Sequence, residues 1–337
     1  MNLAEATALQ KLLSTSKNIV IVPHKNPDGD AIGSSLGLYH FLKFLQKEST
    51  VVVPNDFPKF LKWMPGSETI LIHERQPAAT QAVIERADLI FTLDLNDLSR
   101  TGSLETMLVH SEATFVMIDH HQQPSDYAKV TYSDVTMSST CEMVYHTIAA
   151  FGEAPHITPA IAACLYTGIM TDTGSFKFSQ TTEKTHRVVA HLIEKGAQNT
   201  WIHEQVFNTN TPARLHLLGT ALSNLVILPE YRTAYTSLSQ DELDRYQYSK
   251  GDTEGLVNYG LTLANIDFAV IFIENREEGI IKISFRSTGD FSVNDFARTH
   301  FEGGGHTNAA GGRSTATLQE TIDRFERLVQ TRKKEVV

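Results

Sequence analysis

Short apolar runs alternate with helix-like segments through the first half of the chain, and this order constrains the fold more than any other feature. Residues 18–22, 50–53, 89–93 and 114–118 form runs with the length of buried strands. Between the first two runs, residues 31–45 repeat apolar side chains at the three- and four-residue spacing of a helix face. Because strands that alternate with helices pair in parallel, the sequence predicts an α/β fold with a doubly wound, mostly parallel sheet.

Carboxylates and imidazoles follow these runs, at the carboxyl ends of strands where open α/β sheets bind ligands. The groups that stand at the ends of predicted strands or helices are His24, Asp28, Asp30, Asp94, Asp119, His120, His121 and Asp172. Each has a structural explanation when taken alone: Asp30 could cap the helix that follows it, and Asp172 could form a local turn. Their occurrence together, at successive element ends, predicts a metal site.

The types of side chain indicate which metals would bind. Imidazole and carboxylate donors suit Mn²⁺, or a related ion such as Mg²⁺ or Co²⁺, better than calcium, and a site without thiolates is unlike structural zinc. Two ions about 3.5–4 Å apart need a shared ligand, and Asp94 is the natural bridge. The predicted ligands are His24, Asp28 and Asp94 for one ion, and Asp30, Asp94, His120 and Asp172 for the other.

The second half of the chain has a different character. A chain of 337 residues is long for one core, and a polar, turn-rich stretch at residues 198–214 is the expected linker between domains 1–197 and 215–337. Beyond it, strand-like residues 267–274 and 279–286 flank a natural turn. We therefore expect a second, smaller α/β domain that contains a mixed sheet.

Composition excludes some classes of protein. The net charge of −10 argues against a protein that holds long duplex nucleic acid. No stretch approaches the roughly 18 apolar residues of a membrane span, and the first residues lack the features of a signal peptide. We therefore expect a cytoplasmic protein without a membrane partner, in which Cys141 and Cys164 are buried free thiols. The sequence leaves a homodimer open.

Taken together, these residues resemble the DHH phosphoesterase superfamily. The resemblance rests, in chain order, on His24, Asp28, Asp30, Asp94, the triplet Asp119-His120-His121, and Asp172. Residues 303–312, Gly-Gly-Gly-His-Thr-Asn-Ala-Ala-Gly-Gly, are similar to the glycine-rich signature of the DHH-associated C-terminal domain. By its length and domain pair the chain most resembles the nanoRNase and pAp-phosphatase branch, cytosolic enzymes that degrade very short RNAs and dephosphorylate 3′-phosphoadenosine 5′-phosphate.

The resemblance implies a role for each matching position. The metal-ligand positions are His24, Asp28, Asp30, Asp94, His120 and Asp172, and two Mn²⁺ are the implied cofactors. Asp119 matches a carboxylate that orients an imidazole, and His121 matches a position near the reacting phosphate. The candidates for substrate binding are Gly304, Gly305, His306, Asn308, Arg286, Ser287 and Arg100. Clustered glycines could instead permit tight turns, and Arg286 could be a solvated surface residue.

The predicted reaction is hydrolysis of a phosphoester by a water molecule that two metal ions activate. Asp94, Asp119 and His121 are the predicted catalytic residues. Short RNA oligonucleotides or small nucleotides are the expected substrates. The competing functions are a RecJ-like single-strand DNA exonuclease, a linear or cyclic dinucleotide phosphodiesterase, an inorganic pyrophosphatase, and a nucleotide-binding regulator without activity. The signature at residues 303–312 disfavours the pyrophosphatase, and the complete ligand set disfavours the regulator.

Overall fold

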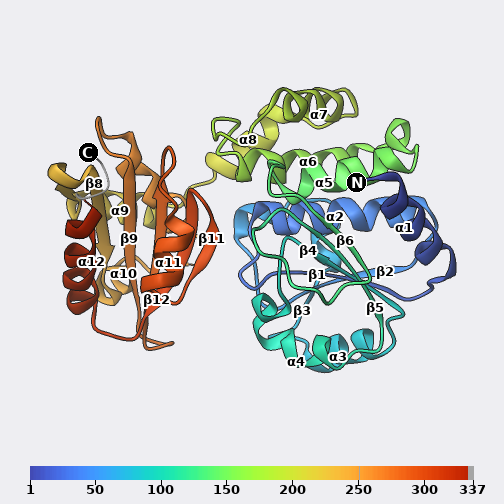
Figure 1. Ribbon diagram of the computed structural model, residues 1–337, viewed down its shortest axis with the longest axis horizontal. Coiled ribbons are helices and arrows are strands. Elements are labelled where there is room, and N and C mark those ends of the chain that lie inside the picture. Colours follow the sequence, from blue (N-terminus) through green and yellow to red (C-terminus); the bar gives the residue numbers. More distant parts are fainter. Residues whose placement is uncertain (250, 333–337) are drawn as a thin grey trace. The chain divides into compact units, whose positions relative to one another are not determined.

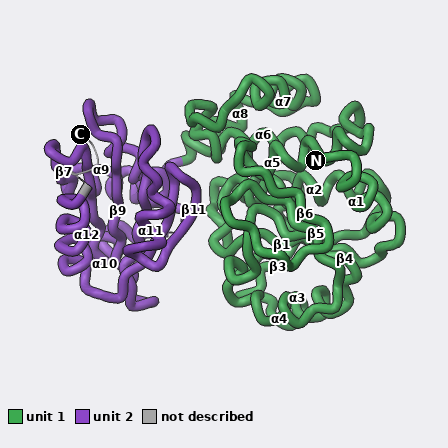
Figure 2. Tube along the Cα trace, in the orientation of Figure 1, with its two compact units in different colours: residues 1–209 green, residues 210–337 purple. Residues whose placement is uncertain are grey.

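The computed structural model describes residues 1–249 and 251–332, and the chain divides into two compact units (Figure 2). Unit 1 is Met1–Thr209 and unit 2 is Asn210–Val337. Residues 333–337 of the expected second domain lie outside the described residues.

Unit 1 is built on a six-stranded sheet in the order β3-β2-β1-β4-β5-β6, with every neighbouring pair parallel (Figure 1). Its strands are β1 (Ile19–Pro23), β2 (Ser49–Val53), β3 (Leu71–Ile72), β4 (Leu89–Leu93), β5 (Thr114–Asp119) and β6 (Val130–Ser133). The chain starts in the middle of this sheet, and the strand order reverses between β1 and β4. That reversal is a topological switch point, where open α/β sheets bind ligands.

Helices cover both faces of the unit 1 sheet. They are α1 (Leu3–Thr15), α2 (Gly29–Phe44), α3 (Pro77–Glu85), α4 (Glu105–Val109), α5 (Thr140–Ala150), α6 (Pro159–Asp172), α7 (Glu183–Glu194) and α8 (Asn199–Phe207). Along β1, Ile19 and Ile21 pack into the core that includes α2 and α6, whereas Val20 and Val22 pack into the core that includes α3 and α4. Because both faces are buried, the central strands are nearly continuous apolar runs in the sequence.

Helices α2 and α6 approach closely because one face of α2 is made of glycine. Gly29, Gly33 and Gly37 recur every fourth residue, so they share a face of the helix. A methyl group at Gly33 would lie 2.6 Å from the carbonyl oxygen of Cys164 on α6. A methyl group at Gly37 would lie 2.4 Å from Leu165 on the same helix. The absence of side chains on this face therefore sets the distance between two helices, of which α2 begins and α6 ends at the carboxyl edge of the sheet.

Unit 2 contains a mixed six-stranded sheet in the order β11-β12-β10-β9-β8-β7, in which β8 and β9 are parallel and the other pairs are antiparallel. Its strands are β7 (Val226–Leu228), β8 (Thr233–Leu238), β9 (Phe268–Asn275), β10 (Ile280–Ser287), β11 (Gly304–His306) and β12 (Ala309–Ser314). Its helices are α9 (Pro212–Ser223), α10 (Gln240–Arg245), α11 (Val293–His300) and α12 (Leu318–Arg332). One face of the sheet packs with α11 and α12, and part of the other packs with α9.

The predicted fold class is confirmed: a doubly wound parallel sheet in one unit and a mixed sheet in the other. The irregular, turn-rich character expected for residues 198–214 is wrong, because α8 and the first turn of α9 occupy most of that stretch. Thr211 caps α9 by accepting a hydrogen bond from Arg214 N–H at 3.1 Å, and Pro212 is the first helical residue. Threonine and proline also favour turns, so the same residues fit both interpretations.

Two further expectations bear on the class of protein. Cys141 and Cys164 are buried free thiols. Among the helices of the described chain, we find none with the length and apolar character that crossing a membrane would require.

Candidate metal centre

The predicted ligands converge at the carboxyl edge of the unit 1 sheet, around its switch point. His24 follows β1 and Asp94 follows β4, and these two strands are neighbours. Asp119 ends β5, the next strand along the sheet, and His120 and His121 come directly after it. The parallel register therefore brings together residues that are about a hundred positions apart in the chain.

The first cluster contains His24, Asp28 and Asp94. His24 Nδ1–H donates a hydrogen bond to the carbonyl oxygen of Lys25 at 2.8 Å, so its Nε2 is the nitrogen that faces the carboxylates. Nε2 lies 3.3 Å from Asp94 Oδ2 and 3.9 Å from Asp28 Oδ1. Asp28 also caps α2 by accepting from the N–H groups of Asp30 and Ala31. The interpretation of Asp30 as the cap of α2 is therefore wrong.

The second cluster contains Asp30, His120 and Asp172. His120 Nδ1–H donates to the carbonyl oxygen of Met137 at 3.2 Å, which directs Nε2 toward the carboxylates. Nε2 lies 3.7 Å from Asp30 Oδ2 and 3.5 Å from both Asp172 Oδ2 and Asp94 Oδ1. Asp172 reaches this position as the last residue of α6.

Asp94 belongs to the first cluster and also faces the second. Its Oδ2 faces His24 and its Oδ1 faces His120. Its backbone has φ of 60°, in the left-handed region that few residues other than glycine adopt. Aspartate tolerates this conformation better than most side chains, and such outliers cluster at functional sites. The sharp bend at the end of β4 therefore accompanies a carboxylate that presents one oxygen to each cluster.

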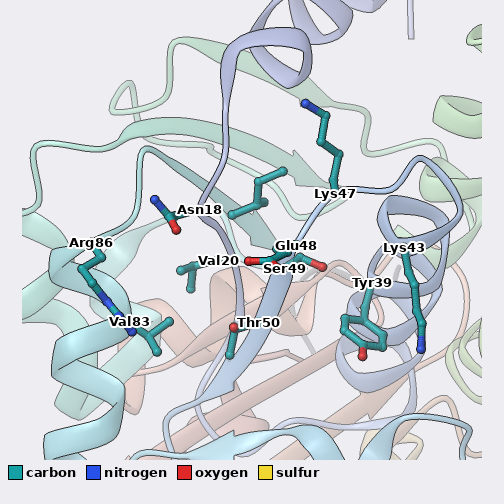
Figure 3. A pocket seen from close by; sticks show the side chains of 11 residues that line it. Asn18, Val20, Tyr39, Lys43, Lys47, Glu48, Ser49, Thr50, Val83 and Arg86 are labelled. Atoms are coloured by element: carbon teal, nitrogen blue, oxygen red, sulfur yellow. The ribbon is translucent and has the colours of Figure 1, made fainter.

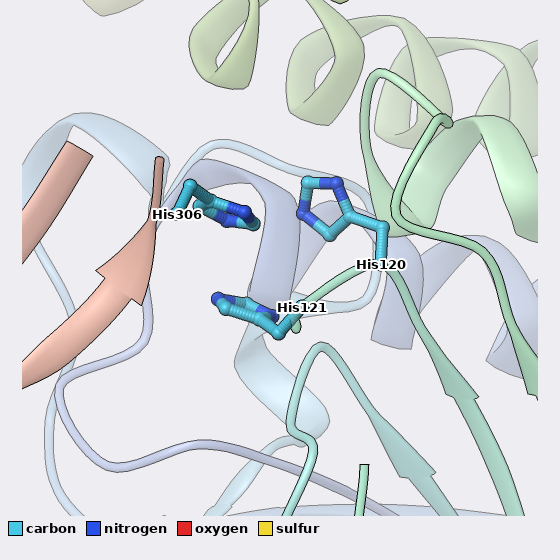
Figure 4. A group of neighbouring side chains, drawn as sticks. All are labelled: His120, His121 and His306. Carbon is cyan, nitrogen blue, oxygen red and sulfur yellow. The ribbon is translucent and has the colours of Figure 1, made fainter. Parts of the chain in front are cut away.

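Asp119 and His121 form a pair beside these clusters. The Asp119 carboxylate accepts hydrogen bonds from His121 N–H at 3.0 Å and from His121 Nδ1–H at 2.7 Å. Figure 4 shows the imidazoles of His120 and His121, which leave the chain just beyond β5. Asp119 thus fixes the ring and tautomer of His121, the arrangement by which an outer carboxylate orients an imidazole.

Asn55 holds the loop that carries the predicted ligands His24 and Asp28, and the sequence analysis missed it. Its side chain accepts from Asn26 N–H at 2.7 Å and donates to Asn26 Oδ1 at 2.8 Å. Asn26 has φ of 57°, so the loop between His24 and Asp28 bends sharply at this point. The sequence offers one signal for this role, a polar residue shortly after β2.

Burial and charge shift the ionisation of the predicted ligands in opposite directions. Burial opposes ionisation of Asp94, but His120 and His24 outweigh it and hold its pKa well below the usual range. Burial also opposes the charged form of His120, but Asp94 and Asp172 outweigh it and raise its pKa well above the usual range. Burial and the carboxylates of Asp94 and Asp172 raise the pKa of Asp30 well above the usual range. Asp30 and His120 therefore hold protons more tightly than usual, and a bound cation would displace those protons.

The neighbouring pair responds to a different charge. Burial and the guanidinium of Arg100 lower the pKa of His121 well below its usual value. Burial and the Asp94 carboxylate raise the pKa of Asp119 to about 6. The positive charge of Arg100 acts to lower the pKa of both His121 and Asp119. This predicted substrate-binding residue therefore lies close to the clusters.

These residues fit divalent cations. Donor atoms that share an ion at about 2.0–2.2 Å must lie within about 4.4 Å of one another. The separations of 3.3–3.9 Å around His24 Nε2 and His120 Nε2 meet that requirement. Buried carboxylates are unfavourable unless they are paired or bind a metal, and Asp30 and Asp94 are only 1% and 2% exposed. Unit 1 thus contains clusters able to hold metal ions.

The predicted substrate-side residues of unit 2 gather at one end of its sheet. Arg286 pairs with Ala309 of β12, and Ala309 pairs with His306, the last residue of β11 (labelled in Figure 4). Side chains of directly paired residues project from the same face of a sheet. Arg286 and His306 therefore share a face of the sheet. The residue between them on β12 is Ala309, whose side chain is only a methyl group.

The side chains of Ser287 and Asn308 form a hydrogen bond with each other. Asn308 Nδ2–H donates to Ser287 Oγ at 2.8 Å and to the carbonyl oxygen of Gly289 at 2.9 Å. Ser287 Oγ–H donates to the carbonyl oxygen of Phe291 at 2.7 Å. These bonds fasten the turn after β10 to the loop before β12.

Part of the glycine run forms a strand at the edge of the unit 2 sheet. Gly304 and Gly305 belong to β11. A methyl group at Gly303 would lie 2.0 Å from the carbonyl oxygen of Gly311, so glycine there permits close approach of backbone to backbone. Gly305 N–H donates to Asn294 Oδ1 at 2.8 Å, a partner from α11 that the sequence analysis did not find.

A pocket at the opposite edge of the unit 1 sheet is separate from the clusters. It measures about 470 Å³ and includes Asn18, Ser49 and Thr50 from the amino ends of β1 and β2 (Figure 3). The amino ends of parallel strands lie away from the carboxyl edge, where the predicted ligands converge. We therefore assign the candidate chemistry to the clusters and not to this pocket.

Comparison with known proteins identifies the family. Residues 18–169 match the DHH family, N-terminal domain, and residues 233–335 match the DHHA1 domain. A bifunctional oligoribonuclease and PAP phosphatase NrnA of Thermus thermophilus is 31% identical over 94% of this chain and 90% of its own length. The chain belongs to the DHH family. The predicted membership in its nanoRNase branch is confirmed as well.

Two further proteins are similar to this DHH protein over most of their length. The NrnA of Bacillus subtilis is 27% identical over 90% of this chain and 92% of its own length. The crystal structure of an exopolyphosphatase-related protein from Bacteroides fragilis shares 40% identity and a TM-score of 0.93, over 99% of this chain and 97% of that one.

Proposed function

We propose that this protein is a manganese-dependent phosphoesterase that hydrolyses short oligoribonucleotides to mononucleotides and 3′-phosphoadenosine 5′-phosphate to AMP. The reaction class follows from the family, and the substrates follow from relatives named as oligoribonucleases and PAP phosphatases. The observation that carries the proposal is Asp94, whose two oxygens face two different imidazoles. A carboxylate in that position suits a pair of ions that share a ligand.

In this proposal the two clusters hold two Mn²⁺ ions. The ligands are His24, Asp28 and Asp94 for the first ion, and Asp30, Asp94, His120 and Asp172 for the second. When bound, the pair of ions would lower the pKa of a water molecule and neutralise charge on phosphoryl oxygens. The backbone carbonyls of Lys25 and Met137 hold both ligand imidazoles with Nε2 toward the clusters.

Two side chains beside the ions would act on the substrate. His121 keeps Nδ1–H on Asp119, which leaves Nε2 to bind a phosphoryl oxygen or to serve the leaving group. Arg100 would attract the phosphate, because guanidinium binds phosphate oxygens in a bidentate manner. In unit 2, Arg286 and His306 share a sheet face and would bind a second phosphate or the sugar.

Replacement of Arg286 by alanine is expected to raise KM by about tenfold with little change in kcat, because the lost interaction would hold substrate and transition state equally. Steady-state kinetics with 3′-phosphoadenosine 5′-phosphate would measure this. Arg276→Ala is the matched control, because Arg276 binds Asp241 at the far end of the same hairpin. An Arg286→Ala enzyme with unchanged KM would show that the side chain is only a solvated surface residue.

Manganese affinity is expected to rise with pH, because the folded, metal-free protein holds protons on Asp30 and His120 that the ion must displace. The pKa of His120 is raised, so a proton still competes for its imidazole above the ordinary histidine value near 6.5, and the raised pKa of Asp30 extends proton competition above the ordinary carboxyl range. Each displaced proton would strengthen binding by about tenfold per pH unit in that range. Calorimetry in buffers of different ionisation enthalpy would count the protons. Constant affinity between about pH 6 and 8, with no proton release, would contradict the assignment.

The substrate class can be tested with one panel. Purified protein with Mn²⁺ would be offered di- to pentanucleotides of RNA and DNA, 3′-phosphoadenosine 5′-phosphate, linear and cyclic dinucleotides, and pyrophosphate. We expect the highest kcat/KM on short RNA and on 3′-phosphoadenosine 5′-phosphate. The Bacillus subtilis cyclic-di-AMP phosphodiesterase GdpP is 25% identical over 96% of this chain, which spans 49% of that protein. A preference for cyclic dinucleotides would therefore replace the substrate assignment and keep the reaction class.

A further inference from the structure

The segment Met137–Glu142, which leads into α5, contacts three of the proposed ligands. The carbonyl oxygen of Met137 accepts from His120 Nδ1–H, and the residues that open the helix bind Asp30 and Asp94. Asp30 and this segment are more than a hundred positions apart in the chain, so nothing local in the sequence joins them.

The side chain of Asp30 accepts two backbone hydrogen bonds from the first turn of α5. Thr140 N–H donates to its Oδ2 at 2.6 Å, and Cys141 N–H donates to its Oδ1 at 2.8 Å. The first N–H groups of a helix have no partner within the helix, and the helix dipole favours negative charge there. Each oxygen of the Asp30 side chain is therefore held by a backbone donor of α5.

Thr140 is the residue that joins the two clusters. Its backbone holds Asp30, and its side-chain Oγ1–H donates to Asp94 Oδ1 at 3.1 Å. This is the Asp94 oxygen that faces His120, while Oδ2 faces His24. The Thr140 hydroxyl thus binds the Asp94 oxygen that faces the second cluster. Thr140 is fully buried, so water cannot replace this hydrogen bond readily.

Buried bonds hold the segment itself in place. Ser139 caps α5 by accepting from Glu142 N–H at 3.1 Å. The Glu142 carboxylate, 2% exposed, accepts from the hydroxyls of Ser138 and Thr185, the second at 3.0 Å. Its other oxygen lies 3.5 Å from His146 Nε2. The start of α5 is therefore tied to α7 by Thr185 and cannot turn without breaking this network.

We propose that Thr140 is a positioning residue whose hydroxyl orients Asp94 so that one carboxylate can serve both metal ions. The inference rests on the proposed dinuclear site and adds a residue to which no metal or catalytic role is otherwise assigned. Thr140 touches neither ion nor substrate in this role. It acts through Asp94 and Asp30, and its loss would weaken the second ion more than the first.

The test compares three variants in metal affinity, spectrum and kinetics. Thr140→Val keeps the shape and the backbone donor but removes the hydroxyl, and Thr140→Ser restores it. The matched control is Thr147→Val, a buried threonine of the same helix whose hydroxyl donates to the carbonyl oxygen of Met143. Calorimetry would give the affinity for each Mn²⁺, and electron paramagnetic resonance would show whether two bound ions are magnetically coupled.

We expect Thr140→Val to bind the second Mn²⁺ about 10–100-fold more weakly, the usual loss when an outer partner of a ligand is removed. Its coupled spectrum should diminish and kcat should fall, whereas Thr140→Ser and Thr147→Val should bind both ions as the unmodified protein does. If Thr140→Val does not fold, Thr140→Ala gives the same comparison. Normal affinity and coupling in the folded variant, or an equal loss in Thr147→Val, would overturn the proposal. An unmodified protein that binds a single ion would instead refute the dinuclear function.

Discussion

Replacement of Asp94 by alanine is expected to abolish turnover, with kcat/KM at least about a thousandfold lower, while the protein stays folded. Loss of the carboxylate removes a ligand from both proposed ions at once, so the chemistry of the metal pair is lost rather than weakened. The fold should survive because Asp94 lies after β4 and not within it. Alanine in the left-handed region costs only about 1–2 kcal/mol. Initial rates with Mn²⁺ and a circular dichroism spectrum would measure both effects.

Two companion variants sharpen this prediction. Asp94→Asn keeps the size of the side chain and its tolerance of positive φ but removes the charge, so it should be as inactive as the alanine variant. Asp88→Asn is the matched control, because Asp88 stands at the amino end of the same strand, where it accepts from Lys17 and Asn18 N–H. Near-normal activity in either Asp94 variant would refute the dinuclear assignment.

Replacement of Gly33 by alanine is expected to destabilise unit 1 by about 1–3 kcal/mol, the usual loss when a methyl group is forced into a packed core. The new methyl group would meet the carbonyl oxygen of Cys164 at 2.6 Å, and backbone cannot move aside as a flexible side chain can. Chemical denaturation followed by tryptophan fluorescence would measure this. The chain has two tryptophans, and both Trp63 and Trp201 lie in unit 1.

Gly219 is the control for Gly33. It lies within α9, and a methyl group there would meet nothing within 4 Å. Gly219→Ala should therefore leave the tryptophan transition in place and stabilise its own helix by up to about 1 kcal/mol, the difference in helix propensity. A Gly33→Ala protein as stable as the unmodified one would show that α2 and α6 can separate without cost.

The parts of the fold that the sequence predicted are those that local pattern determines. Leu89–Leu93 is apolar except for Thr92 because β4 is buried on both faces, and it appears in the structure with the expected bounds. The carboxyl ends of parallel strands meet at one edge, so Asp94 and His120 could be expected to lie near each other before any coordinates were known.

The features that the sequence did not predict depend on distant partners. Gly33 is spaced like any helix residue, and its role appears only when α6 packs against it. Thr140 looks like an ordinary residue near a helix cap in the sequence, and its contact with Asp30, more than a hundred positions earlier in the chain, appears only in the structure. Clustered glycines near Gly303 could have meant only tight turns, but in the structure glycine at this position permits the close approach of the Gly311 backbone.

Crystals soaked in Mn²⁺ and measured at the manganese absorption edge would test the central claim most directly. The account predicts two anomalous peaks about 3.5–4 Å apart, one among His24, Asp28 and Asp94, the other among Asp30, His120 and Asp172, with an Asp94 oxygen beside each. A map with no peak at the carboxyl edge of this sheet, or with one ion that Asp94 does not touch, would contradict it.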